Sequence, residues 1–149
     1  MKILVDADAC PVVKIVEKIA KEKQIELVLV CDTAHCMCSD YAQVVVVDKG
    51  ADAADFKLVT LADKGDVVVT QDYGVACMML GKGVNPIHQS GKWFTNDNID
   101  LLMMERDIAK KERRKSSKNH LKGPKKRTPE DDLRFQESFL KLLDYVRKK

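Results

Sequence analysis

The sequence predicts an α/β fold: a three-layer sandwich with a mainly parallel central sheet, followed by C-terminal helices. Two features carry this prediction. The strand candidates are continuous runs of Val, Ile and Leu instead of alternating ones, which is typical of strands that helices cover on both faces. Helical patterns separate most of these runs, as the crossovers between parallel strands require.

The first part of the chain opens with a strand followed by a helix. Ile3–Asp6 is predicted to be a short buried strand. Pro11 suits a first helical residue because its φ angle is already fixed, and the helix is expected to run to about Lys23. The next two strand candidates are Ile25–Cys31 and, after a polar loop, Gln43–Asp48.

The middle of the chain continues this alternation. A helix is expected over Gly50–Leu61, and the strand Asp66–Thr70 follows it. A second helix over Tyr73–Leu80 then leads to a last strand at Val84–His88. These elements complete a sheet of parallel type.

Two further helices are predicted near the C-terminus. Asn96 or Asp97 begins an amphipathic helix, and its inward residues are expected to be Ile99, Leu102, Met103 and Ile108. Thr128 is expected to cap the last helix, with Pro129 in its first turn. The residues expected to dock this helix on the body are Leu133, Phe135, Phe139, Leu142, Leu143 and Val146.

Length and composition predict one globular domain in the cytoplasm. The chain has 149 residues, and no apolar run approaches the roughly 20 residues that a membrane-spanning helix needs. The first residues follow a strand pattern and lack the features of a signal peptide. Five cysteines, an odd number, indicate reduced thiols instead of a disulfide framework.

Charge is distributed very unevenly along the chain. Residues 1–109, the predicted α/β domain, contain 11 Lys/Arg and 17 Asp/Glu, whereas residues 110–127 contain ten Lys/Arg and one Glu. Residues 128–149 are balanced and form the predicted docking helix. The basic strap, defined as residues 110–127, predicts a nucleic-acid partner, with RNA favoured over DNA; a solvated helix end and linker is the alternative. Its basic residues are Lys110, Lys111, Arg113, Arg114, Lys115, Lys118, Lys122, Lys125, Lys126 and Arg127.

Five aspartates are predicted to gather at one edge of the sheet. Asp6 ends the first strand, Asp8 follows it, and Asp72 follows the strand Asp66–Thr70; Asp52 and Asp55 begin the preceding helix. If these two strands are neighbours, Asp6 and Asp72 converge at the carboxyl ends of the strands, where α/β sheets bind ligands. Several carboxylates at one edge favour a divalent cation, and hard oxygen ligands suit Mg²⁺ or Mn²⁺.

Structural roles are the alternative for most of these aspartates. Asp8 could accept hydrogen bonds near the start of the following helix, Asp72 could cap the next one, and Asp52 could be a helix cap with Asp55 as its partner. Asp6 has no such role, because it ends a buried strand several residues before any helix.

Several motifs resemble the bacterial YaiI/YqxD family over nearly the whole chain. They are VDADACPVV, GADAAD, GDVVVTQD, GKWFTNDNID and KGPKKR. This family resembles PIN-like domains, which implies an acidic pocket that holds Mg²⁺ or Mn²⁺ and cleaves RNA or DNA. The segment GADAAD also resembles the Gly-x-Glu-Ala-Asp-Asp motif of flap-endonuclease-like proteins, although Phe56 stands where its last acid would be.

The resemblance implies a role for each acid. Asp6, Asp55 and Asp72 would hold the first cation and be catalytic, while Asp52 and Asp8 would complete a second cation site or orient water. Thr70 and Gln71 would support them by hydrogen bonds to carboxylates or substrate. Three aromatic residues lie near these motifs: Tyr73 adjoins the site, and we interpret Trp93 and Phe94 as core residues. We give His35, His88 and His120 little weight as general bases.

Two other functions remain open. VDADAC also fits the Asp-x-Asp motif of haloacid-dehalogenase-like phosphohydrolases, with Asp6 as nucleophile and Asp8 as acid/base, but no later acidic pair follows in the required order. The other alternative is a non-catalytic RNA-binding or ribosome-associated module in which the basic strap does the binding.

Overall fold

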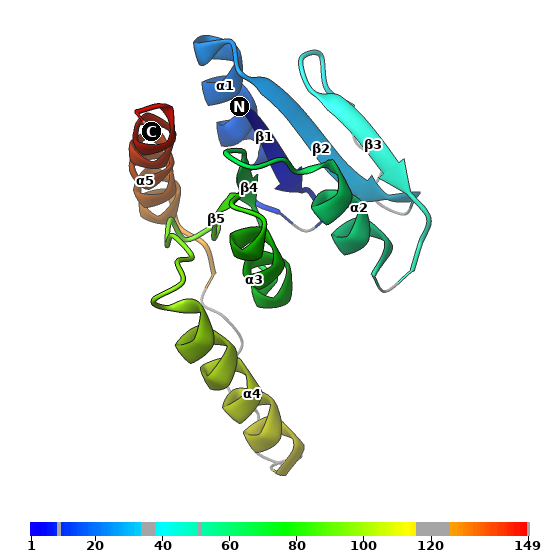
Figure 1. The fold of residues 1–149 in the computed structure, drawn as a ribbon, viewed down its shortest axis with the longest axis vertical. Coiled ribbons are helices and arrows are strands. Elements are labelled where there is room, and N and C mark those ends of the chain that lie inside the picture. The colour runs from blue at the N-terminus through cyan, green and yellow to red at the C-terminus, as the bar shows by residue number, and fades with distance from the viewer. Residues whose placement is uncertain (9, 34–37, 51, 116–125, 149) are drawn as a thin grey trace.

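The computed structural model describes residues 1–8, 10–33, 38–50, 52–115 and 126–148, with only the backbone for 113–115. Figure 1 shows its elements. The strands are β1 (Lys2–Asp6), β2 (Glu26–Asp32), β3 (Gln43–Val47), β4 (Val67–Val69) and β5 (Asn85–Ile87). The helices are α1 (Val13–Lys23), α2 (Ala53–Leu61), α3 (Tyr73–Gly81), α4 (Ile99–Lys115) and α5 (Pro129–Arg147).

The sheet is parallel throughout, with the strand order β3-β2-β1-β4-β5. The predicted α/β class is therefore confirmed. β1 lies between β2 and β4, and Val5 is in register with Leu29 on one side and Val69 on the other. Because the chain moves outward from β1 in both directions, the strand order reverses between β1 and β4. A crevice outside the carboxyl ends of such a pair is where open α/β sheets bind ligands.

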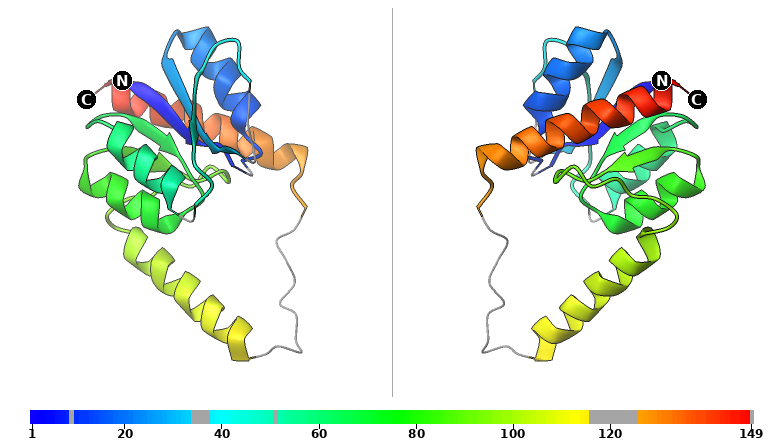
Figure 2. Two further views of the ribbon diagram at one scale, coloured as in Figure 1. Left: turned by 90° about the vertical axis from the view of Figure 1, so that its right-hand side faces the viewer. Right: turned by 90° about the vertical axis from the view of Figure 1, so that its left-hand side faces the viewer.

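Helices cover both faces of the sheet. Helices α1 and α5 pack on one face, and α2 and α3 pack on the other (Figure 2). Along β1, Ile3 and Val5 belong to the first core cluster and Leu4 to the second, as the alternation of side chains along a strand requires. The β1 strand is thus buried on both faces, which explains its uninterrupted apolar run.

Some elements begin later than the sequence predicted. The first helical hydrogen bond of α1 runs from the Val16 N–H to the Val12 carbonyl, so Pro11 lies in a turn before the helix and is not its first residue. Helix α2 likewise begins at Ala53, after a turn at Asp52. The connection from β1 to α1 and the connection from β3 to α2 are therefore longer loops than predicted, and both begin at the carboxyl-terminal edge of the sheet.

Helix α5 is anchored by its cap and by its apolar face. The Thr128 hydroxyl accepts a hydrogen bond from the Asp131 N–H, and the Asp131 carboxylate accepts one from the Thr128 N–H, which completes a capping box. The predicted docking residues are buried except Leu133, which is 58% exposed. Leu133 lies in the first turns of the helix, where the body does not cover it.

Helix α4 leads away from the body (Figures 1 and 2). Its start packs on the body: Ile99 and Leu102 meet Ala76 of α3 and the buried Phe94, and Met103 is partly buried beside them. Ile108, predicted to face inward, is 52% exposed because it lies on a side of the helix that the body does not cover. In the described residues, no helix is both long and apolar enough to cross a bilayer.

We predict that the core under α5 dominates stability. Phe139 is fully buried and stacks on Phe135 with ring centroids 5.3 Å apart, so Phe139→Ala should lower the free energy of unfolding by about 3–5 kcal/mol in urea titration. Phe56→Ala is the matched control: Phe56 is 74% exposed, and its loss should change stability by less than about 0.5 kcal/mol. Equal effects of the two substitutions would contradict this packing.

Candidate functional site

The carboxyl ends of β1 and β4 are joined by the side chain of Thr70. Its hydroxyl donates a hydrogen bond to the Asp6 carboxylate (3.3 Å) and accepts one from the Asp72 N–H (3.1 Å). Thr70 is buried, so this bridge is shielded from water. The hydrogen bond from Thr70 to a carboxylate was expected from the sequence, and the pairing of β1 with β4 brings its two ends together.

Asp6 has a strongly perturbed titration. Burial is the main cause that raises the pKa of its carboxyl group to about 6; the nearby charges of Asp55, Asp8 and Asp72 contribute to this rise, and the Thr70 hydrogen bond opposes it. The strand end therefore holds a partly buried acid that other acids surround. Negative charge at this edge is not fully neutralised by the protein itself.

Helix α2 contributes Asp55 from its first turn. Burial raises the pKa of the Asp55 carboxyl group, and the charges of Asp72 and Asp52 add to the effect. Asp52 is exposed and occupies the position before the helix, but its side chain makes no capping hydrogen bond. The prediction that Asp52 caps this helix is wrong, because Asp52 meets the helix only through its backbone carbonyl.

Two of the five aspartates have defined backbone partners. Asp72 caps α3, as predicted, by accepting hydrogen bonds from the N–H groups of Gly74 (2.8 Å) and Val75 (3.1 Å). Asp8 accepts from the Asp32 N–H at 3.2 Å to each of its oxygens, and thereby links the loop after β1 to the end of β2. Both contacts hold the loops that surround Asp6.

The donor chemistry of this edge suits a hard divalent cation. All five predicted ligands supply carboxylate oxygens, and the mutual charges of Asp6, Asp55 and Asp72 are of the kind that a cation relieves. Within the described ranges, however, no three acidic, histidine or cysteine side chains stand close enough together to ligate one ion. The residues therefore fit in type, while their side chains are not arranged as a finished coordination sphere.

A surface hollow of about 390 Å³ lies directly beside Asp72. It is lined by Gln71, Tyr73, His88, Glu105, Arg106 and Ala109. Gln71 was predicted as a supporting residue, and Tyr73 adjoins the site in sequence. Arg106 and Glu105 were not predicted, because nothing in the local sequence shows that the middle of α4 lies beside the start of α3.

His88 is more closely involved than the sequence indicated. It packs edge-on against the rings of both Tyr73 and Phe94, at centroid distances of 6.3 and 6.0 Å. Burial lowers the pKa of His88, and the charges of Arg127 and Lys92 lower it further. Its Nδ1 accepts a hydrogen bond from the Ser90 N–H (3.0 Å), so the neutral ring carries its proton on Nε2.

The described part of the basic strap divides into two kinds of residue. Lys110, Lys111 and Lys126 are exposed. Arg127 instead pairs with Asp132 (2.6 Å) and donates to the Gln89 carbonyl (3.0 Å), which fastens the start of α5 beside β5. Arg113, Arg114 and Lys115 are described by backbone only, and Lys118, Lys122, Lys125, His35 and His120 lie outside the described residues.

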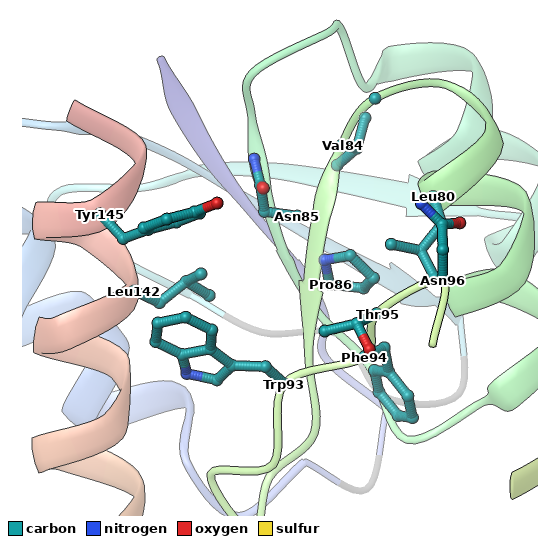
Figure 3. Close-up of a pocket in the computed structure, with 11 residues that line it drawn as sticks. Leu80, Val84, Asn85, Pro86, Trp93, Phe94, Thr95, Asn96, Leu142 and Tyr145 are labelled. Atoms are coloured by element: carbon teal, nitrogen blue, oxygen red, sulfur yellow. The ribbon is translucent and has the colours of Figure 1, made fainter. Parts of the chain in front are cut away.

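Another hollow, of about 440 Å³, lies between α5 and the segment that follows α3 (Figure 3). Tyr145 and Leu142 project from α5 toward Asn85 and Pro86, with Trp93 below them. None of its lining residues is charged. Phe94 is buried, which agrees with its interpretation as a core residue, whereas Trp93 is half-buried, packs against the core and donates from Nε1 to the Ser138 hydroxyl (2.9 Å).

We predict that Asp6 destabilises the metal-free protein near neutral pH. An acid whose pKa is higher in the folded state binds more protons there, so the free energy of unfolding falls as the pH rises from about 4 to about 6 and stays low above. In EDTA at neutral pH, Asp6→Asn should raise the free energy of unfolding by about 2–3 kcal/mol relative to the wild type, and this difference should vanish toward pH 4.

Asp63→Asn is the control for this substitution. Lys2 lowers the pKa of Asp63 through a hydrogen bond at 2.8 Å, so the same chemical change should reduce stability at neutral pH instead of raising it. Urea titrations of both variants at two pH values measure the effect. If both variants are stabilised, or neither is, the ionised carboxylate of Asp6 does not destabilise the folded protein in the way predicted here.

Comparisons with known proteins agree on one family. The model of the family described as "Uncharacterized BCR, YaiI/YqxD family" matches residues 4–145. A UPF0178 protein of Clostridium acetobutylicum is 62% identical over 143 residues, which cover 96% of this chain and 97% of the relative. A UPF0178 protein of Lachnoclostridium phytofermentans is 53% identical over 147 residues, covering 98% and 99%. No solved structure matches the chain significantly. The chain belongs to the YaiI/YqxD family.

Proposed function

We propose that this protein is a divalent-metal-dependent nuclease that cleaves phosphodiester bonds, with RNA favoured over DNA. One observation carries the proposal: Thr70 bridges Asp6 and Asp72 at the point where the strand order reverses, with Asp55 close enough to raise the pKa of Asp6. Buried, mutually repelling carboxylates at a ligand-binding edge are a common signature of a functional site. A PIN-like relationship, on which the sequence resemblance rests, is part of this proposal.

Each acidic residue then has a distinct task. Asp6, Asp55 and Asp72 would hold Mg²⁺ or Mn²⁺, which when bound supplies an activated water and neutralises charge on the phosphate. Thr70 keeps the Asp6 carboxylate in position, and the backbone bonds of Asp72 keep the start of α3 against the site. Asp52 and Asp8 are placed at the border of the site, where they would orient water or complete a second ion site.

The basic residues supply the attraction that the acidic edge lacks. Lys110 and Lys111 are exposed on α4, which leads away from the body, so they would contact the phosphate backbone beyond the site. This arrangement equally suits a binding module that does not cleave, and that is the second candidate function. The cytoplasm is the proposed location, since five cysteines, an odd number, favour reduced thiols over a disulfide framework.

The phosphohydrolase alternative finds less support. Asp8 would have to reach the substrate as general acid, but both its oxygens already accept hydrogen bonds from the Asp32 N–H, a contact that ties the side chain to the end of β2. The nuclease needs no protein nucleophile and makes no such demand on Asp8.

The test is cleavage of labelled RNA and DNA in Mn²⁺, in Mg²⁺ and in EDTA. We expect cleavage in metal only, and a loss of at least about 100-fold in Asp6→Asn and Asp72→Asn, since these replacements keep size and remove a ligand charge. Asp40→Asn is the matched control, because Asp40 is exposed and outside the site. It should cleave like the wild type.

Three results would overturn the nuclease assignment. Cleavage that persists in EDTA or in both site variants would show that another group carries the reaction. A wild type that binds nucleic acid in a salt-dependent way and cleaves nothing would favour the binding module. Formation of a phosphoryl-Asp6 intermediate with small phosphate esters would favour the phosphohydrolase.

A further inference from the structure

The hollow beside Asp72 has the size and composition of a ligand site. Its volume of about 390 Å³ lies in the range of small-molecule pockets, roughly 300–1,000 Å³. It is formed by the start of α3, the residue after β5 and the middle of α4, three elements that are distant in sequence. Gln71 and Tyr73 flank Asp72 in the chain and line the hollow, so whatever binds here is adjacent to the acidic edge.

One wall of the hollow is aromatic. Tyr73 and His88 line it, and the buried Phe94 supports both rings from behind at centroid distances of 5.5 and 6.0 Å. His88 is held by Ser90 through Nδ1, and burial lowers the pKa of its ring, which favours the uncharged form. A fixed pair of aromatic rings offers a surface on which any of the nucleobases can stack, whatever the sequence of the strand.

The opposite wall carries a cation with unused hydrogen-bonding capacity. Arg106 lines the hollow, and its Nε is a buried nitrogen that has no hydrogen-bond partner among the described residues. Its ion pair with Asp107, at 3.7 Å, is too long for a hydrogen bond. A guanidinium group in this state is suited to a phosphate, which it binds through two parallel N–H groups.

Glu105 completes the lining with an acceptor. A carboxylate beside Arg106 disfavours a small free anion in the hollow, since the two negative charges would repel. It suits a ligand whose phosphate meets Arg106 while a ribose hydroxyl or base amino group meets Glu105. The hollow between α5 and Trp93 has aromatic walls but no charged lining residue, so it lacks this combination.

We propose that this hollow binds the nucleotide next to the phosphodiester that is cleaved, with its base on Tyr73 and His88 and its phosphate on Arg106. The position relative to the cleaved bond rests on the proposed function, whereas the binding itself needs no metal. A base stacked in the hollow cannot be paired in a duplex. The bound strand is therefore single at this nucleotide.

The experiment measures binding in EDTA, where no metal-dependent cleavage occurs. The probe is a short fluorescent oligouridine, and its affinity is compared for wild type, Arg106→Gln, Tyr73→Leu and Tyr73→Phe by anisotropy. We expect Arg106→Gln and Tyr73→Leu to weaken binding about tenfold each, and Tyr73→Phe, which keeps the ring, to bind like the wild type. Arg134→Gln is the matched control, since Arg134 is 68% exposed on α5 and pairs with Glu130 and Asp131.

A second readout does not depend on variants that fold. The same oligouridine with one 5-iodouridine is photocrosslinked to the wild type, and the modified residue is identified by mass spectrometry. Crosslinks to Tyr73 or His88 support the proposal. Crosslinks confined to Trp93 or Tyr145 overturn it and place the base in the hollow of Figure 3.

The outcomes separate this inference from the nuclease. If binding in EDTA depends on Tyr73 and Arg106 but the protein cleaves nothing in Mn²⁺, the nucleotide site is supported and the nuclease function is rejected. Unchanged affinity in a folded Arg106→Gln protein, or a loss as large in Arg134→Gln, overturns the nucleotide site even if Asp6-dependent cleavage is seen. If Tyr73→Leu fails to fold, the affinity of Arg106→Gln and the position of the crosslink still test the nucleotide site.

Discussion

The hydroxyl of Thr70 is the contact on which the candidate site depends. It donates to Asp6 at the end of β1 and accepts from the Asp72 N–H after β4, so one buried side chain sets the spacing of two acidic loops. This contact exists only because β1 and β4 are parallel neighbours. Asp72 in turn caps α3, which positions Tyr73 and the aromatic wall. Sheet pairing, acidic edge and adjacent hollow are thus parts of one connected arrangement.

Electrostatics divide the molecule into complementary regions. Burial, together with the acids around Asp6, raises its pKa to about 6, which means that the fold tolerates uncompensated negative charge at this edge. Positive charge lies nearby but is held apart from Asp6: Arg106 faces the hollow, and Arg127 is paired with Asp132. A protein that only needed a stable core would gain by bringing such groups together. Their separation is consistent with a site that requires an external cation on one side and a polyanion on the other.

The sequence predicted most of the fold and the position of the acids. Buried strands are recognisable from continuous apolar runs, and parallel neighbours bring the carboxyl ends of β1 and β4 to one edge. The prediction failed where burial depends on contacts between elements that are distant in sequence. Ile108 and Leu133 satisfy the helical pattern, yet both are exposed because the body does not cover them. The capping role given to Asp52 was wrong, and Arg106 was missed, because neither loop geometry nor the position of α4 beside the start of α3 is visible in local sequence.

The central claim is that the carboxylates at the junction of β1 and β4 bind a divalent cation. Titration of the protein with Mn²⁺, followed by electron paramagnetic resonance of the free ion, measures this without any substrate. The account predicts at least one bound Mn²⁺ per chain, lost when Asp6 or Asp55 is replaced by Asn and kept when the exposed Asp40 is replaced. Absence of binding in the wild type, or binding that survives both site substitutions, would contradict it.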